Sequence, residues 1–188
     1  ESNDVIVSIS KVTHDIVNNV APEVENHYLP HGVDSDIFRK LNKDELANLK
    51  KQNFGKEEDK FIFFWNNRNA RRKQTGSLVV WFGEFAKEVG PENVRLIMHT
   101  DPNDPHGQDI HALLKDNNIA DGRIVISHQK VPPEHLSAMY NMADCTINIS
   151  DAEGFGLATL ESLSCGTPII VNMTGGLQEQ VTDGEEWF

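Results

Sequence analysis

The sequence is short of cysteine and contains no long apolar run. Its 188 residues include two cysteines, Cys145 and Cys165, and both stand in apolar surroundings. We therefore expect reduced core thiols in a cytoplasmic protein rather than a disulfide. No apolar stretch approaches the roughly 20 residues that a membrane-spanning helix needs. The opening residues, ESNDVIVSIS, also lack the basic stretch and the cleavage site of a signal peptide.

Positive charge is scarce as well. The chain has 17 lysines and arginines against 29 aspartates and glutamates, which gives a formal net charge of −12. A nucleic-acid-binding protein needs a basic surface, and anionic lipid attracts basic segments, so this charge argues against both partners. Hydrophobic residues make up 38% and charged residues 24%, as expected for a globular domain.

Short apolar runs alternate along the chain with longer segments of helical spacing. Several of the runs are rich in Val, Ile or Phe, as strands buried on both faces are. We expect strands at residues 5–10, 61–65, 95–100, 123–127, 146–150 and 168–171. Helices are expected at residues 42–54, 76–89, 109–118, 133–143 and 157–165. The alternation predicts an α/β fold, a Rossmann-like parallel sheet with helices on both faces.

The two ends of the chain indicate its domain organisation. The segment APEVENHYLPHGVDSDIF separates a first strand–helix unit from the rest, and the last residues, EEWF, directly follow an expected turn. We interpret residues 1–29 as the end of a truncated preceding domain. Residues 30–188 are interpreted as most of a second domain, cut short at its own end.

The loop that follows the strand at residues 146–150 has the features of an anion site. In an open parallel sheet, ligands lie at the carboxyl ends of strands, near helix N-termini. Gly154 and Gly156 would let the backbone approach a ligand closely. The first-turn amides of Leu157 and Ala158 would point outward without partners, which favours phosphate.

Two glutamates, Glu153 and Glu161, bracket this loop and helix start. Carboxylates repel phosphate, but they accept hydrogen bonds from the neutral hydroxyls of a ribose or a hexose. A nucleotide sugar offers a diphosphate, a ribose and a sugar together. Taken alone, each glutamate fits a structural role better, since an acid near a helix N-terminus is favourable in itself. Their combination with the glycines and the preceding strand favours a ligand site.

Positive charge for a diphosphate comes from the segment NNRNARRKQTG, directly after the strand at residues 61–65. It holds Arg68, Arg71, Arg72 and Lys73, four cations in six residues of an otherwise acidic chain. This segment also joins a strand end to a helix, so we expect it at the same edge of the sheet. Arg71 and Arg72 fit a solvated turn equally well, whereas Arg68 and Lys73 are interpreted as phosphate ligands.

These segments resemble the motifs of the retaining GT-B glycosyltransferases of family 4. EGFGLATLESLSCGTPIIV resembles the E-x7-E signature, and NNRNARRK resembles the G-R-x-x-x-x-K phosphate loop. LPHGVDSDIF is similar to P-N-G-V-D-x-x-x-F, with His31 in place of Asn. ISHQKVPPEHLSAMYNMADC and TGGLQEQVTDG are similar to the two segments that flank the signature. The five matches occur in the family's order across residues 29–184.

The resemblance implies a set of donor-binding residues. They are Arg68, Lys73, Val131, Glu153, Gly154, Phe155, Gly156, Leu157, Ala158 and Glu161. By this resemblance Arg68 and Lys73 would grip the donor diphosphate and offset its charge as it leaves, and the amides of Leu157 and Ala158 would contact the phosphates.

The remaining roles implied by the resemblance concern the nucleoside and the sugar. Glu161 would bind the ribose hydroxyls, and Val131 would lie near the base. Glu153 and the amides of residues 154–156 would hold the transferred sugar, so Glu153, Arg68 and Lys73 are the expected catalytic residues. No metal and no cofactor are implied, because the cations and the helix start supply the electrostatic stabilisation.

Two departures from the family pattern concern the phosphate loop. Asn67 stands where a glycine usually precedes the arginine, and Gln74 stands where a glycine usually follows the lysine. Asn tolerates unusual backbone angles better than most residues, so Asn67 is a plausible substitute for its glycine. Without these glycines, the two departures put in question how closely the backbone of this loop approaches the donor.

The expected function is transfer of a sugar from a GDP-, UDP- or ADP-sugar. The acceptor, a carbohydrate, lipid or protein, is not indicated. The resemblance places the acceptor site in an N-terminal domain that this chain lacks, so we expect the fragment alone to be inactive. A phosphorylase or epimerase on the same fold, and a non-catalytic nucleotide-binding domain, remain as alternatives.

Overall fold

Five parallel strands form the main sheet, in the order β5-β4-β3-β6-β7. The computed structural model describes residues 4–55 and 59–182. The strands are β3 (Phe61–Asn66), β4 (Val94–His99), β5 (Ile124–Ser127), β6 (Cys145–Asn148) and β7 (Ile169–Val171). Each predicted strand of this sheet is therefore confirmed, with ends that differ by one or two residues.

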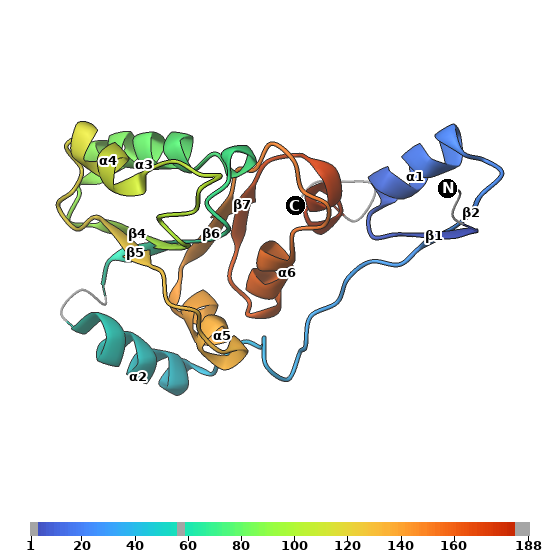
Figure 1. Ribbon diagram of the computed structural model, residues 1–188. Helices are drawn as coiled ribbons and strands as arrows, with labels where there is room; N and C mark the ends of the chain where they lie inside the picture. Colours follow the sequence, from blue (N-terminus) through green and yellow to red (C-terminus); the bar gives the residue numbers. More distant parts are fainter. Residues whose placement is uncertain (1–3, 56–58, 183–188) are drawn as a thin grey trace.

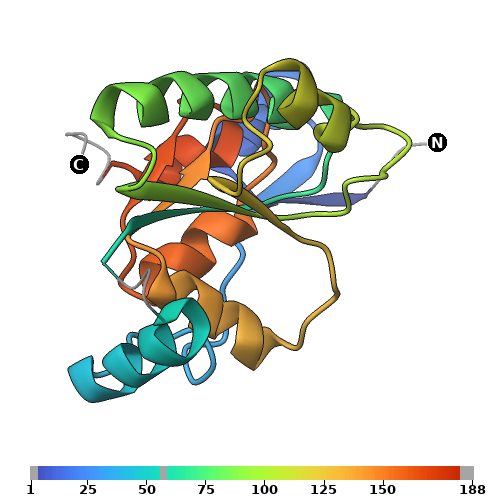
Figure 2. The same ribbon diagram turned by 90° about the vertical axis from the view of Figure 1, so that its left-hand side faces the viewer.

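Helices cover both faces of the main sheet, as Figures 1 and 2 show. On one face lie α3 (Thr75–Val89) and α4 (Ile110–Asp116), and on the other lie α2 (Lys43–Phe54), α5 (Pro133–Met142) and α6 (Leu157–Ser164). Each face has its own apolar cluster. Leu96 and Met98 of β4 pack toward α3 and α4, whereas Ile62 and Phe64 of β3 pack toward α5.

Local sequence signals explain several of these elements. Helix α2 begins with the predicted capping box: the side chain of Asn42 accepts from the amide of Glu45, and the Glu45 carboxylate accepts from the amide of Asn42. Strand β6 is buried along its whole length, in agreement with its central place beside β3 and β7. Cys145 and Cys165 are buried free thiols, as predicted.

A smaller unit precedes the main sheet. It consists of β1 (Val5–Ser8), α1 (Lys11–Val20) and β2 (Glu25–Tyr28), and β1 pairs with β2 in a separate two-stranded parallel sheet. Strand β1, predicted at residues 5–10, thus lies outside the main sheet, and strand β2 was not predicted. Its sequence, ENHY, is largely exposed and carries no apolar run. The assignment of residues 1–29 to a preceding domain remains a prediction.

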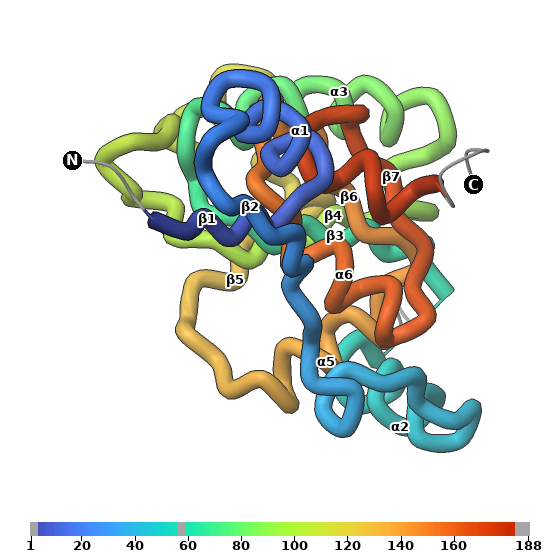
Figure 3. Tube along the Cα trace, turned by 90° about the vertical axis from the view of Figure 1, so that its right-hand side faces the viewer, coloured from blue at the N-terminus to red at the C-terminus, as the bar shows by residue number. Residues whose placement is uncertain are grey.

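The smaller unit touches the rest of the protein through η3 (Gly175–Gln180), as Figure 3 shows for α1. The Glu179 carboxylate accepts from the backbone amide of Lys11 at 2.5 Å and from the Tyr28 hydroxyl at 2.6 Å. The hydrogen bond to Glu179 is the main cause that raises the pKa of Tyr28 to about 12. A carboxylate at the first turn of α1 is favourable, because the N-terminus of a helix carries partial positive charge.

Among the described residues, no helix is both long enough and apolar enough to cross a membrane.

Candidate functional site

The candidate site forms where the carboxyl ends of β3 and β6 meet. These strands pair in parallel, so the loops that follow them emerge at one edge of the sheet. The loop after β3 leads through η2 (Arg71–Lys73) into α3, and the loop after β6 leads into α6. The Asp151 amide donates to the backbone carbonyl of Arg72 at 2.8 Å, which fixes the two loops together.

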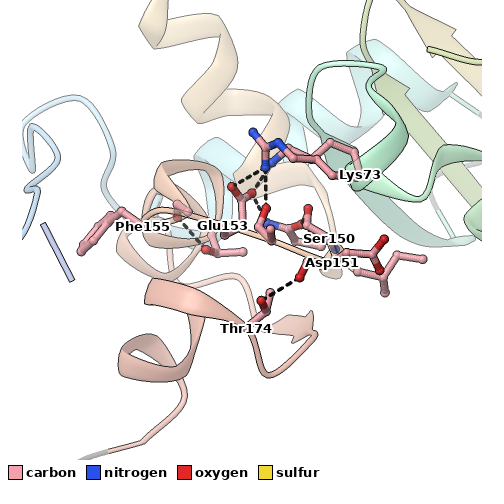
Figure 4. A network of polar contacts seen from close by, with 12 residues as sticks. Lys73, Ser150, Asp151, Glu153, Phe155 and Thr174 are labelled. Atoms are coloured by element: carbon pink, nitrogen blue, oxygen red, sulfur yellow. Dashed lines mark hydrogen bonds and ion pairs between the residues drawn. The ribbon is translucent and has the colours of Figure 1, made fainter. Parts of the chain in front are cut away.

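Lys73 and Glu153 form the centre of the site. Their side chains are only 7% and 9% exposed, and the Lys73 ammonium donates to the Glu153 carboxylate (Figure 4). Arg72 donates to the second carboxylate oxygen at 3.1 Å, and the Asn148 amide donates to the first at 3.1 Å. The structure therefore brings together two of the three expected catalytic residues, and it adds Arg72 and Asn148.

The surroundings keep Glu153 ionised. Burial alone would raise its pKa, but the hydrogen bonds and charges of Lys73, Asn148 and Arg72 outweigh burial and lower it. Burial lowers the pKa of Lys73, and the partnership with Glu153 opposes that effect. The site thus holds a carboxylate against a buried ammonium, with a second cation beside them.

Helix α6 begins at a glycine with a left-handed backbone. Gly156 caps the helix with φ 90°, ψ 59°, a left-handed conformation that favours glycine, and no side chain caps the first turn. Within the described part of the chain, the amides of Gly156, Leu157 and Ala158 donate no hydrogen bond to another protein group. These amides are free to bind an anion.

The other loop residues line the side of the site toward the smaller unit. Phe155 is buried and packs edge-on against His31, with ring centroids 5.3 Å apart. In Figure 4 it lies on the far side of Glu153 from Lys73. A Cβ built on Gly154 would lie 3.6 Å from Ile9 Cδ1, at ordinary contact distance. The loop thus has Ile9 near Gly154 on one side, while Gly154 itself stays exposed.

Glu161 lies on α6 and belongs to a separate hydrogen-bond chain. The Tyr140 hydroxyl of α5 donates to Glu161 Oε2 at 2.8 Å, and Asn66 Nδ2 at the end of β3 donates to the Tyr140 hydroxyl at 2.8 Å. Burial raises the pKa of Glu161, and the hydrogen bond from Tyr140 partly opposes this. This hydrogen-bond chain engages Oε2 of Glu161 and leaves its Oε1 without a hydrogen bond to the described residues.

Arg68 lies elsewhere on this edge of the sheet. Its guanidinium donates to both oxygens of Asp104, at 2.5 and 3.2 Å, and Nη2 lies 3.0 Å from His106 Nδ1. Hydrogen bonds from Arg68 are the first of the causes that hold the pKa of Asp104 well below its usual range. Asp104 follows β4, on the opposite side of β3 from β6. The structure therefore joins Lys73, but not Arg68, to the loop that precedes α6.

Val131 is also separate from the ion pair. It lines a hollow of about 430 Å³ between α2, α5 and the sheet, whose other walls include Phe54, Ile97 and Met139. No residue of the 153–161 segment lines this hollow. The structure thus places Val131 near the sheet's α5 face, in a hollow that neither glutamate lines.

The two departures in the phosphate loop have different outcomes. Gln74 has φ 56°, ψ 37°, so the backbone needs the left-handed conformation for which glycine is the usual residue. Its side chain donates to Asp151 and accepts from the Ser77 hydroxyl at 2.8 Å. Asn67 has no positive φ, so its tolerance of unusual angles is not used, and its Nδ2 is buried without a partner among the described residues.

Sequence reasoning missed Asn148, Tyr140 and Asp104. Asn148 carried a usable signal, because a polar residue in a strand buried on both faces needs a partner. Tyr140 sits in a helix whose amphipathic pattern concealed its contact with Glu161. Asp104 belongs to an irregular loop, where no periodic pattern in the sequence indicates which way a side chain points. Among the described residues, no group of three His, Cys, Asp or Glu side chains has the geometry to hold a metal ion.

Comparison with known proteins identifies a family. The family described as Glycosyl transferases group 1 matches residues 47–188. The whole chain is 26% identical to 46% of N-acetyl-alpha-D-glucosaminyl L-malate synthase of Bacillus anthracis.

Solved structures share the fold. Sucrose-phosphate synthase of Thermosynechococcus elongatus matches 97% of this chain with a TM-score of 0.81 and 25% identity, over 44% of its own length. HepE of Anabaena, solved in complex with UDP-glucose, matches 98% of this chain with a TM-score of 0.78 and 17% identity, over 49% of its own length. The chain therefore spans less than half of each of these proteins.

Proposed function

Since this chain belongs to the glycosyl transferases group 1, family 4, and corresponds to the C-terminal half of a GT-B glycosyltransferase, we propose that it binds the nucleoside-diphosphate sugar donor of a retaining enzyme. The observation that carries this proposal is the buried Lys73–Glu153 pair beside the uncapped start of α6. An ammonium and free amides suit a diphosphate, whereas a carboxylate suits sugar hydroxyls. One site offers both chemistries.

In the proposed complex, the diphosphate lies between Lys73 and the first turn of α6. The amides of Leu157 and Ala158 bind phosphate oxygens, because they have no hydrogen bond to the described protein and the helix start carries partial positive charge. Lys73 then divides its hydrogen bonds between the diphosphate and Glu153. Arg68 joins from the β4 side once its guanidinium turns from Asp104 toward the phosphate.

The glutamates divide the remainder of the donor. Glu161 accepts from the ribose through the oxygen that Tyr140 leaves without a hydrogen bond. Glu153 and the amides of residues 154–156 hold the transferred sugar, with Val131 toward the base. Support for Glu153 comes from its ionised state, because an ionised carboxylate only accepts hydrogen bonds.

The chemical step breaks the bond between the anomeric carbon and the diphosphate oxygen and forms a bond from that carbon to the nucleophilic oxygen of the acceptor, whose proton passes to the departing diphosphate. Negative charge then grows on the leaving diphosphate, and Lys73, Arg68 and the α6 amides lower its energy. Groups that are held in place before the reaction supply this stabilisation without reorganisation. Stabilisation that increases toward the transition state raises turnover, which ordinary substrate binding does not do.

The acceptor and its site belong to the remainder of the full-length protein. We propose that the acceptor site lies in the preceding domain, because residues 4–28 reach the donor loop through Ile9 and reach η3 through Tyr28. The chain by itself is proposed to bind a donor weakly and to transfer no sugar.

A donor screen on the full-length protein tests this function. UDP-, GDP- and ADP-sugars are tried one at a time, with release of nucleoside diphosphate and the shift in unfolding temperature as readouts. We expect one base to give both release and stabilisation, and Glu153→Gln to abolish release. If a nucleotide sugar stabilises the wild-type protein but none of the sugars tried releases nucleoside diphosphate, the result would favour a non-catalytic nucleotide-binding domain.

A further inference from the structure

The segment η3 forms the back wall of the donor loop. A Cβ on Gly175 would lie 1.7 Å from the carbonyl oxygen of Glu153, and a Cβ on Gly176 would lie 2.7 Å from that of Gly154. The Gly176 amide donates to the Glu153 carbonyl at 3.3 Å. Backbone therefore packs directly on backbone here, and the position of the donor loop depends on η3.

One side chain of η3 reaches into the loop. Gln180 Nε2 donates to the carbonyl oxygen of Phe155 at 2.7 Å and to that of Gly156 at 3.1 Å. The Thr159 hydroxyl lies 2.6 Å from Gln180 Oε1 and 2.7 Å from the Gly156 carbonyl, and its single proton serves one of these acceptors at a time. The two amide protons of Gln180 thus hold two successive carbonyl groups of the loop.

The orientation of these carbonyls sets the orientation of two amides. In a trans peptide unit, the C=O and the following N–H point in opposite directions, and the described chain has no cis peptide bond. Because the carbonyls of Phe155 and Gly156 point at Gln180, the amides of Gly156 and Leu157 point away from η3. Neither amide donates to another group in the described part of the chain.

We propose that Gln180 is a positioning residue for the donor: it turns the Gly156 and Leu157 amides toward the diphosphate and the sugar. The inference rests on the proposed function. Gln180 itself contacts no ligand atom and acts through the loop. Without its amide donors, the Phe155 carbonyl loses its hydrogen bond, and the Gly156 carbonyl keeps only those from Thr159 and Leu160. The two peptide units are then no longer held together in one orientation by a single side chain.

The experiment uses the full-length protein and compares Gln180→Met with Gln178→Met. Methionine matches glutamine in length but donates no hydrogen bond. Gln178 lies in the same segment, and among the described residues its side chain donates only to the Gly175 carbonyl of η3, at 3.4 Å, so it is the matched control. Affinity is measured for UDP, GDP and ADP by calorimetry, and for the corresponding free nucleosides by ligand-observed NMR.

We expect Gln180→Met to weaken binding of the preferred diphosphate about tenfold, equivalent to about 1.4 kcal/mol. Affinity for the free nucleoside, which has no phosphate, should stay within about twofold of wild type. Such a change is small beside the tenfold loss expected for the diphosphate. Gln178→Met should change neither affinity. If Gln180→Met does not fold, Gln180→Glu serves instead, since it keeps the acceptor for Thr159 and removes the donor.

The outcomes separate this inference from the proposed function. Wild-type protein that binds no nucleoside diphosphate overturns both. Wild-type protein that binds, with Gln180 variants that bind equally well, overturns the inference alone. Equal losses for diphosphate and nucleoside also overturn it, because they show a general structural role for Gln180.

Discussion

Lys73 and Glu153 are 80 positions apart in the chain and form a buried ion pair. The pair joins the loop after β3 to the loop after β6, so it fixes the site before any ligand arrives. It also sets up a competition. An incoming phosphate and Glu153 both seek the Lys73 ammonium, and the strength of donor binding depends on how that ammonium is divided.

The first prediction concerns Glu153→Gln, which removes the negative charge beside Lys73. Binding of the plain nucleoside diphosphate should be kept or become tighter, because Lys73 no longer shares its charge with a carboxylate. Sugar transfer should fall through kcat, since the contact of Glu153 with the sugar strengthens toward the transition state. Calorimetry and steady-state rates on the full-length protein measure the two effects.

Glu161→Gln gives the opposite pattern. It should weaken the nucleoside diphosphate and the nucleotide sugar alike, because the ribose is present in both. Loss of diphosphate binding in Glu153→Gln, with full binding in Glu161→Gln, would reverse the two assignments. Two variants that behave as wild type would show that the glutamates are structural.

A second prediction assigns Lys73 to the diphosphate. Lys73→Ala should weaken nucleoside diphosphate binding by about 1.5–3 kcal/mol, the usual contribution of a hydrogen bond to a charged group. Arg71→Ala is the matched control, because Arg71 lies in the same turn and forms no ion pair or side-chain hydrogen bond with the described residues. Calorimetry compares the two variants, and equal affinities would remove Lys73 from the phosphate site.

A third prediction follows from the raised pKa of Glu161. The ionised carboxylate accepts ribose hydroxyls best, so affinity should be full above this pKa and should fall as the pH drops through it, at values above 4.5. Tyr140→Phe removes the hydroxyl that lowers the pKa, so the midpoint of the fall should move to higher pH. Nucleoside diphosphate affinity is measured by calorimetry at a series of pH values.

The phosphate of the ligand titrates in the same range, so Glu161→Gln provides the correction. Its pH profile reports the ligand alone, and the difference from wild type reports Glu161. An unchanged midpoint in Tyr140→Phe would show that the hydroxyl of Tyr140 does not tune this carboxylate.

A fourth prediction tests the strained turn at Gln74. Gln74→Ala and Gln74→Gly lose the same contacts with Asp151 and Ser77, but only glycine adopts the left-handed backbone without a Cβ clash. The alanine variant should therefore be less stable than the glycine variant by about 1–2 kcal/mol. Urea unfolding of both variants measures the difference, and equal midpoints would show that this turn relaxes.

Sequence patterns predicted the main sheet well because each of its strands is a short apolar run between helices. Strand β2 escaped because ENHY has no apolar run, and its place depends on tertiary pairing with β1. Helix ends with clear caps, such as Asn42 before α2, were placed to within a residue. Local sequence thus indicates the strands of the main sheet and the start of α2, whereas β2 depends on its pairing with β1.

Sequence reasoning predicted which residues of the candidate site lie at the strand ends. It did not predict most of the contacts between them. The meeting of Lys73 with the loop before α6 follows from the parallel pairing of β3 with β6. The Arg68–Asp104 pair could not be foreseen, because an irregular loop directs Asp104. Tyr140 was hidden for a related reason: helix packing, rather than sequence spacing, brings its hydroxyl to Glu161.

The most direct test is a crystal structure of the full-length protein with its preferred nucleoside diphosphate. The account predicts phosphate oxygens within hydrogen-bond distance of the Leu157 and Ala158 amides and of Lys73 Nζ, and ribose hydroxyls at Glu161. A nucleotide bound away from the start of α6, with the Lys73–Glu153 pair untouched by phosphate, would contradict it.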